Sequence, residues 1–306
     1  MTHKGWKDYL LKSSLPLEYS VTETLRKLNV EKPSEYKYEK PNEQGILTTF
    51  SIDVHGSTLR NKNKLDLELF VECKYRYQGT KWIFTPKSFK SLELADFKDT
   101  FITLDALCRS SKINSKLINS FSENYELCGK GVEIYNDGLN PKTITQAVSQ
   151  LQYSLVKKVA EGLDDQIDDF LGNPDQIHIL VPIIVTTAEL WRLNPGTTIE
   201  GIQDANELED VASKTDFLLV HEAPDNDLNR YTIKHLIESF SEEQKEEMTK
   251  ILKKNKSGSF DGYVRSFART YPSIFAVIEY NSLEKRLSNM LNFFNRSDIL
   301  MQRENT

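Results

Sequence analysis

Two acidic residues and a lysine on neighbouring strand-like segments form the strongest chemical signal in the chain. Glu72 and Lys74 stand two residues apart in the apolar segment LDLELFVECKYRY (65–77). Successive side chains of a strand point to opposite faces, so Glu72 and Lys74 project side by side. Asp53 lies in the preceding segment ILTTFSIDVHG (46–56) and approaches Glu72 if the two segments pair as a hairpin. Two acidic residues and a lysine at this spacing indicate a metal site with an adjacent lysine.

The chemistry of such a site follows from its charges. Two neighbouring carboxylates repel each other unless a cation lies between them. Ligands that are all oxygen suit Mg²⁺ or Mn²⁺, which also accept phosphate oxygens. A lysine beside the ion can orient or deprotonate an attacking water, or stabilise charge on a phosphate.

The Glu-x-Lys spacing alone has little value. It recurs at Glu35–Lys37 and at Glu243–Lys245, in polar or helical surroundings. Only Glu72–Lys74 lies on an apolar strand that follows another strand with an aspartate. Asp66 is too near Glu72 in the chain to replace Asp53 across a hairpin.

The segment around this strand is basic, although the protein has a formal net charge of −6. Eight lysines and arginines against three acids lie between residues 55 and 90. Such a local patch can bind phosphates, and a solvated hairpin edge protected by lysines is the alternative. The residues expected to contact nucleic acid are Arg60, Lys62, Lys64, Arg76 and Lys81.

The elements that position these residues are predicted from hydrophobic periodicity. Helices are expected at 14–30, 141–163, 230–255 and 281–294, and strands at 46–56, 65–77, 177–190, 217–222 and 273–280. Residues 33–42 resemble a loop or short strand, 80–89 a strand or loop, and 98–130 fit no clear pattern. Pro182 inside 177–190 suggests a bulge or an edge position.

This order predicts an α/β fold with a central mixed sheet flanked by helices. No composition break marks a second domain, so a single domain spans 1–306. Its core motifs lie in 15–190, and 200–306 reads as a largely helical elaboration.

Composition narrows the class of protein. Hydrophobic residues make up 39% and charged residues 27%, which is typical of globular chains and not of disordered ones. The longest apolar run is too short to cross a membrane, and the first 20 residues lack a signal-peptide pattern. Three cysteines without a CxxC pair favour a reducing compartment and a cytoplasmic protein.

The run SIDVHGS, a turn and LELFVECKYR resembles the core of the PD-(D/E)xK nuclease superfamily, and VECKYR is similar to its Mrr-like branch. The resemblance is firmest over 15–90. It implies a restriction-endonuclease-like sandwich and matches Asp53, Glu72 and Lys74 to the family pattern. Ser51 and Ile52 stand where the family commonly has an Arg-Glu pair. The chain after about residue 200 carries no family motif.

The resemblance also implies further site residues and a function. Glu18, an acid in the apolar stripe of the 14–30 helix, matches the glutamate that many members carry on the first core helix. The backbone carbonyl of Val71 or Cys73 is expected to add a metal ligand. The implied activity is Mg²⁺- or Mn²⁺-dependent hydrolysis of nucleic acid, DNA more than RNA, in prokaryotic defence, as a homodimer or with a defence-system partner.

Other residues have functional and structural interpretations that the sequence leaves open. Gln146 and Gln150 either approach the site or face solvent, and His55 either contacts substrate or is structural. Gly129–Gly131 only faintly resembles a phosphate-binding turn. His178, His221 and His235 show no metal-ligand spacing. A run of aromatic residues near the motif could either stack on unpaired bases or pack a layer of the sheet. Its members are Tyr75, Tyr77, Trp82, Phe84 and Phe89.

Two functions compete with a nuclease. The chain could bind nucleic acid without cleaving it, because a fold does not fix a function. It could also be an interaction subunit of a larger assembly, with the charged helices at 230–255 as its contact surface.

Overall fold

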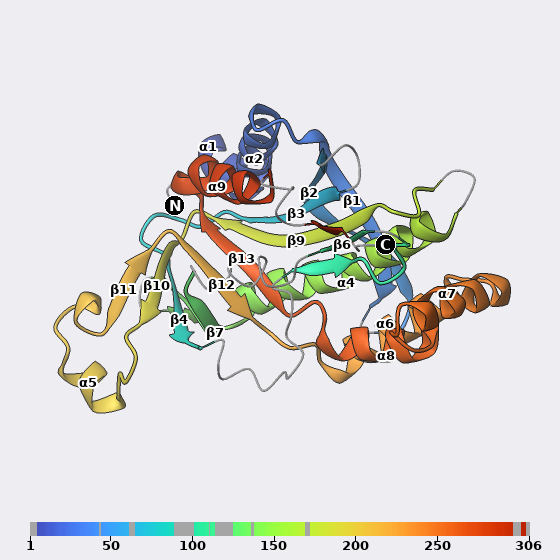
Figure 1. Ribbon diagram of the computed structural model, residues 1–306. Helices are drawn as coiled ribbons and strands as arrows, with labels where there is room; N and C mark the ends of the chain where they lie inside the picture. The colour runs from blue at the N-terminus through green and yellow to red at the C-terminus, as the bar shows by residue number, and fades with distance from the viewer. Residues whose placement is uncertain are drawn as a thin grey trace.

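A large mixed sheet with helices on both faces organises the protein in the computed structural model (Figure 1). The structure describes residues 5–42, 44–60, 65–88, 101–109, 111–113, 125–135, 138–168, 172–295 and 301–303. Its strands follow the order β1-β2-β3-β9-β13-β12-β7-β4-β10-β11, with β5 beside β9 and β8 beside β7. This confirms the predicted α/β class with a central mixed sheet.

The strands of the main sheet have these bounds: β1 Glu31–Pro41, β2 Leu47–Arg60, β3 Leu65–Lys74, β4 Lys81–Pro86, β5 Ile102–Leu104, β7 Leu127–Tyr135, β8 Gly138–Asn140, β9 Ile177–Thr186, β10 Glu189–Leu193, β11 Ala212–Thr215, β12 Phe217–His221 and β13 Ile274–Glu279. Strands β6 (Ser111–Ile113) and β14 (Met301–Arg303) form a separate pair.

The helices have these bounds: α1 Trp6–Lys12, α2 Leu15–Lys27, α4 Lys142–Ile167, α5 Ile199–Asp204, α6 Asn226–Glu238, α7 Glu242–Lys254, α8 Phe260–Thr270 and α9 Leu283–Asn295. Two short 3₁₀ turns lie at Leu208–Asp210 and Tyr280–Ser282. No helix in the described parts of the chain is long and apolar enough to cross a membrane.

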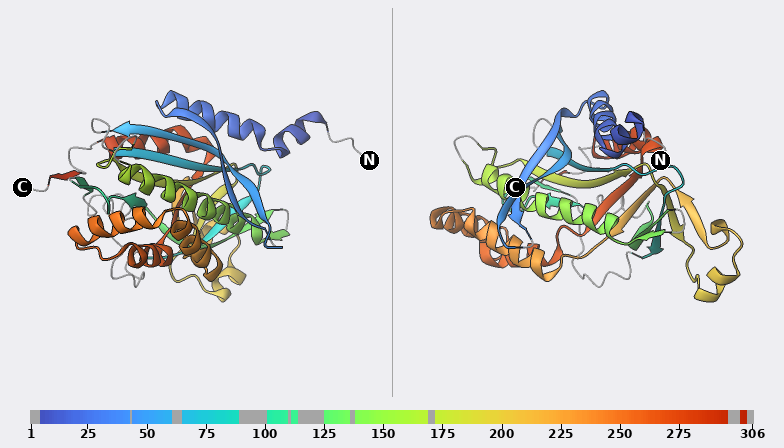
Figure 2. Two further views of the ribbon diagram at one scale, coloured as in Figure 1. Left: turned by 90° about the vertical axis from the view of Figure 1, so that its right-hand side faces the viewer. Right: turned by 180° about the vertical axis from the view of Figure 1, so that it is seen from behind.

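Two hydrophobic cores lie on opposite faces of the sheet. Helix α4 and the group α6–α8 cover one face, and α2 and α9 cover the other (Figures 1 and 2). In β3, Leu67, Leu69 and Val71 point to the α2 side, while Phe70 packs on the α4 side. Glu72 and Lys74 follow the alternation of Phe70, so they lie on the α4 side.

Strand β9 is buried along its whole length, as its continuous apolar run predicts. It pairs with β3 on one side and with both β5 and β13 on the other. Pro182 falls between the β5 partners, which end at Leu180, and the β13 partners, which begin at Ile183. The proline therefore lies in the centre of the sheet and not at an edge. It stands where the neighbouring strand of β9 changes from β5 to β13.

The chain after residue 200 is more than a helical elaboration. Strands β12 and β13 lie between β9 and β7, in the middle of the sheet. The helical segment predicted at 230–255 corresponds to α6 and α7, and α8 follows them. The 33–42 segment is the edge strand β1, whose polar side chains face solvent on one side.

Candidate functional site

Strand pairing brings Asp53 next to Glu72, as the hairpin prediction requires. Strands β2 and β3 pair with Val54 opposite Val71, so Asp53 and Glu72 are the next residues along the ladder. In the β1–β2 ladder, Ser34 pairs with His55 and Tyr36 pairs with Ile52. The two pairs are two residues apart on β1 but three residues apart on β2. This extra residue is a β-bulge, a feature that re-aims side chains and is frequent beside active sites.

The bulge orients the Asp53 carboxylate toward β3. Its Oδ2 atom accepts a hydrogen bond from the backbone N–H of Cys73 at 2.6 Å. Burial raises the pKa of Asp53, while this hydrogen bond and the charge of Lys74 lower it. The Cys73 thiol is buried in the core on the α2 side, so the metal-ligand prediction for Cys73 concerns only its backbone carbonyl.

Glu72 is a buried carboxylate with one oxygen engaged and the other free of protein partners. The residue is 1% exposed, and its Oε1 atom accepts a hydrogen bond from the Lys74 ammonium. Within the described part of the chain, its buried Oε2 atom has no hydrogen-bond partner. Burial and the charge of Asp53 raise the pKa of Glu72 to about 7. A cation bound beside Oε2 would relieve both effects.

Helix α4 fixes the position of Lys74. The Lys74 Nζ atom also donates a hydrogen bond to Oε1 of Gln150, at 3.1 Å. Gln146, one helical turn earlier, is exposed. Of the two glutamines that the sequence left open, Gln150 therefore lies at the site and Gln146 does not.

Glu18 reaches the same charge cluster from α2, on the other side of the sheet. It is half-buried, and burial together with the charge of Asp53 raises its pKa. Glu35 of β1 adds a further carboxylate, because its charge raises the pKa of both Glu18 and Asp53. The sequence showed Glu35 only as part of a polar Glu-x-Lys copy, and strand pairing brings it near the site.

The residues expected to bind nucleic acid are not gathered into one described patch. Lys62, Lys64 and the side chain of Arg60 lie outside the described residues. Arg76 donates from Nε to Glu133 at 2.5 Å and also bonds the carbonyl of Tyr75. Lys81 begins β4 and is half-buried, and its charge lowers the pKa of Glu189. Nucleic-acid contact by these residues stays a prediction.

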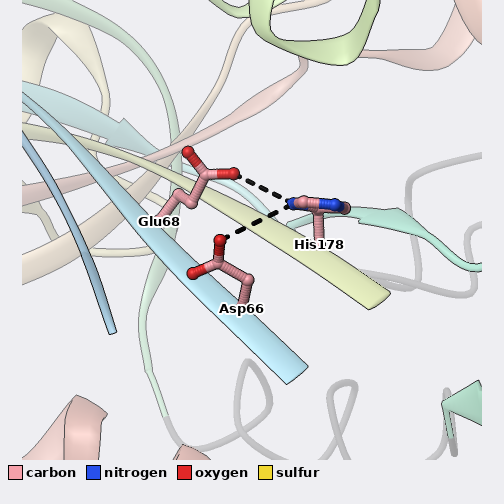
Figure 3. Close-up of side chains that lie close together, drawn as sticks. All are labelled: Asp66, Glu68 and His178. Atoms are coloured by element: carbon pink, nitrogen blue, oxygen red, sulfur yellow. Dashed lines mark hydrogen bonds and ion pairs between the residues drawn. The ribbon is translucent and has the colours of Figure 1, made fainter. Parts of the chain in front are cut away.

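A second polar cluster lies further along the same face of β3 (Figure 3). The parallel β3–β9 ladder places Asp66 opposite His178. Glu68 is two residues after Asp66 and therefore points to the same face of β3. The Nδ1 atom of His178 lies 3.1 Å from Glu68 Oε1 and 3.8 Å from Asp66 Oδ2 (Figure 3). The sequence did not predict this grouping, because it depends on pairing between distant strands.

The charges of this second cluster are already balanced by protein groups. His55 Nε2 lies 2.9 Å and Lys158 Nζ 3.0 Å from Glu68 Oε2. Burial favours a high pKa for Glu68, but the hydrogen bonds from His178 and His55 and the charge of Lys158 hold it well below its usual range. Burial lowers the pKa of His178, but hydrogen bonds to Asp165 and Glu68 raise it to about 9.

The three side chains in Figure 3 lie close enough together to hold a metal ion. A metal there would have to displace Lys158 and take the proton from His178, whereas the oxygen of Glu72 is unpartnered. We therefore interpret the Asp66–Glu68–His178 cluster as an ion-pair network that joins β3, β9 and α4. The interpretation of His55 as structural agrees with its contact to Glu68.

Asp53 and Glu72, with Glu18 nearby, present only oxygen donors, which fits Mg²⁺ or Mn²⁺. The chain was compared with protein-family models, with curated proteins and with solved structures, and none of them matches it. The resemblance to PD-(D/E)xK nucleases thus remains a prediction based on the Asp53 and Glu72-x-Lys74 motif.

Proposed function

We propose that the protein is a metal-dependent nuclease of the PD-(D/E)xK type, with a restriction-endonuclease-like core. The observation that carries the proposal is the state of Glu72. A buried carboxylate with a raised pKa, one oxygen on a lysine and the other unpartnered is costly without a cation. Perturbed acids of this kind gather at functional sites.

Each residue has a defined role in this proposal. Asp53 and Glu72 would hold Mg²⁺ or Mn²⁺, with Glu18 close by. The ion would polarise the scissile phosphate and lower the pKa of a water. Lys74 has three N–H donors, of which Glu72 and Gln150 accept two. The remaining N–H would orient the attacking water or stabilise charge on the phosphate.

Substrate contacts outside the centre would be made mainly to phosphates. The basic residues of 60–81 would bind the backbone without reading sequence, so binding would weaken as salt rises. DNA is the first substrate to test, and a role in prokaryotic defence is the biological setting that the motif suggests.

The test is cleavage of supercoiled plasmid by the purified protein in Mg²⁺, in Mn²⁺ and in EDTA, beside a Lys74→Ala variant. We expect nicked or linear plasmid only with metal, and a loss of cleavage in the variant. Equal cleavage by both proteins would rule out the proposed role of Lys74. Plasmid retardation in a gel without cleavage would favour a binding module that lacks turnover.

One observation favours a second function, an interaction subunit. Trp6, Tyr9 and Tyr19 are each more than 60% exposed, on α1 and α2. These are the first two helices of the chain, and they lead to the N-terminus at the outside of the molecule (Figure 2). Trp6 and Tyr9 are three residues apart and so share one side of α1, and a contiguous exposed apolar patch often marks a protein contact. Light scattering of the intact protein and of a Trp6→Ser, Tyr9→Ser variant tests whether this face supports a homodimer.

A further inference from the structure

A cleft of about 600 Å³ lies along the free edge of the sheet, between β1 and helices α4 and α6. Its volume falls in the range of roughly 300–1,000 Å³ that is typical of small-ligand sites. Its lining includes the rings of Tyr38, Tyr231 and His235, the lysines Lys37 and Lys157, and the carboxylates Glu39 and Glu161.

Aromatic rings form one wall of this edge cleft. Tyr231 and His235 stack with ring centroids 5.5 Å apart and an interplanar angle of 17°, and Tyr153 lies 5.0 Å from Tyr231. Burial lowers the pKa of His235, which favours the neutral form of its ring. Half-buried rings of this kind can stack on nucleic-acid bases of any sequence.

Lysines lie beside the rings. Lys157 donates to the carbonyl of Lys37 at 3.1 Å, and its ammonium is 5.3 Å from the ring centre of Tyr36. Lys40 lies beside the cleft and outside its lining, with its ammonium 4.8 Å from the ring centre of Phe50 and 4.5 Å from that of Tyr153. Among the described residues, no carboxylate pairs with Lys40. Burial lowers its pKa, so an incoming phosphate would be a favourable partner.

Tyr38 of β1 lies on the α4 side of the sheet, as Glu72 of β3 does, with β2 between the two strands. It lines the cleft, is 1% exposed, and stacks on Phe50 with ring centroids 6.0 Å apart. Burial and the charge of Glu72 raise the pKa of its hydroxyl. Within the described residues this buried hydroxyl has no hydrogen-bond partner.

We propose that the edge cleft binds unpaired bases of a single-stranded nucleic acid, with Lys40 and Lys157 facing its phosphates. The proposal rests on the nuclease function and names its substrate class. The bases of a duplex are stacked and paired inside the helix, so they cannot reach the rings of the cleft without being extruded. The site would therefore act on single strands, on unpaired ends and on the segments that negative supercoiling transiently unpairs in a plasmid.

The test measures binding without turnover, by fluorescence anisotropy in EDTA. Labelled single-stranded DNA of about 16 nucleotides is compared with a duplex of the same sequence and with unlabelled dAMP as competitor. We expect the single strand to bind at least about tenfold more tightly than the duplex, since only unpaired bases can stack on the rings. We expect dAMP to compete only weakly.

Two charge-reversal variants make the test specific. Lys157→Glu changes a half-exposed lysine of the cleft that pairs with Glu161 one turn away. Lys250→Glu changes an exposed lysine of α7 that pairs with Glu247, and it serves as the matched control. We expect Lys157→Glu to weaken single-strand binding about tenfold and Lys250→Glu to leave it unchanged.

The proposal would be overturned by equal binding of single strand and duplex, by equal effects of the two variants, or by dAMP binding as tightly as the strand. Plasmid cleavage in Mg²⁺, measured in parallel, reports separately on the nuclease function. Strand-selective binding without cleavage would contradict the nuclease and leave the cleft assignment in place.

Discussion

At the scale of single residues, the protonation of Glu72 would control metal binding at the proposed site. Its pKa of about 7 lies above that of an ordinary glutamate, because the residue is buried beside Asp53. The acid therefore keeps a proton below pH 7, and the proton must leave before a cation can bind. Metal affinity should rise with pH up to about 7 and level off above it.

This leads to a direct measurement of Mn²⁺ binding by electron paramagnetic resonance. We expect the affinity to increase about tenfold for each pH unit below 7 and to level off above it. Asp53→Asn should weaken binding at every pH. An affinity that does not change between pH 5.5 and 8 would contradict the assignment of Glu72 as a ligand.

Gln150 should act on the reaction through Lys74 and not through the fold. Because it accepts a hydrogen bond from Lys74 at 3.1 Å, Gln150→Ala would let the ammonium move away from its working position. We expect kcat for cleavage to fall about tenfold with little change in KM or Tm. Gln146→Ala, one turn away and exposed, is the control, and an equal loss in both variants would contradict the role.

At the scale of elements, the β2–β3 hairpin and helix α4 hold the site together. The alternation in 65–74 and the apolar stripe of 142–163 predict these elements well, because each depends on local sequence. Contacts between distant segments are different. Lys74 and Gln150 are 76 residues apart, and Glu68 and His178 are 110 apart. No local pattern reveals such pairs, so the sequence left Gln150 open and missed the Asp66–Glu68–His178 cluster.

The Gly129–Gly131 stretch illustrates how an element explains a motif. Gly131 lies in β7, where a Cβ atom would come within 2.5 Å of the Phe84 ring and 3.0 Å of Ile144. The glycine thus allows β7 and β4 to pack against α4, which is a structural reason for its presence. The faint resemblance to a phosphate-binding turn is unnecessary to explain it.

Gly131→Ala should therefore destabilise the protein without a specific effect on ligand binding. We expect a loss of about 1–3 kcal/mol in the free energy of unfolding, from overpacking against Phe84. Chemical denaturation measures this change. Gly129→Ala, whose added Cβ would meet only the Thr85 hydroxyl at 3.1 Å and the Lys87 side chain at 3.9 Å, should cost less. Equal stability of the wild type and Gly131→Ala would contradict this packing.

At the scale of the whole molecule, the sheet cannot be divided at residue 200. Strands β12 and β13 lie between β9 and β7 and supply buried residues to both cores. The sequence predicted both strands but not their place in the sheet, because strand order depends on long-range packing. The α/β class was predictable from the alternation of elements, whereas the position of the C-terminal third was not.

A chain that ends at residue 200 should fail to fold, although it contains every residue of the proposed metal site. Without β12 and β13, the apolar edges of β9 and β7 would be exposed to water. We expect circular dichroism and a thermal scan of the 1–200 fragment to show no cooperative transition. A cooperative transition with metal-dependent activity would contradict the single-sheet account.

The central claim is that Glu72, with Asp53 and Lys74, forms a metal-dependent phosphodiester-hydrolysing centre. The most direct measurement is plasmid cleavage in Mg²⁺ by the wild type, by Glu72→Gln and by Glu243→Gln. Glu243 belongs to the same Glu-x-Lys spacing on the exposed face of α7, so it is the matched control. We predict a loss of at least about 100-fold in Glu72→Gln and unchanged cleavage in Glu243→Gln. Cleavage by Glu72→Gln at the wild-type rate would contradict the account.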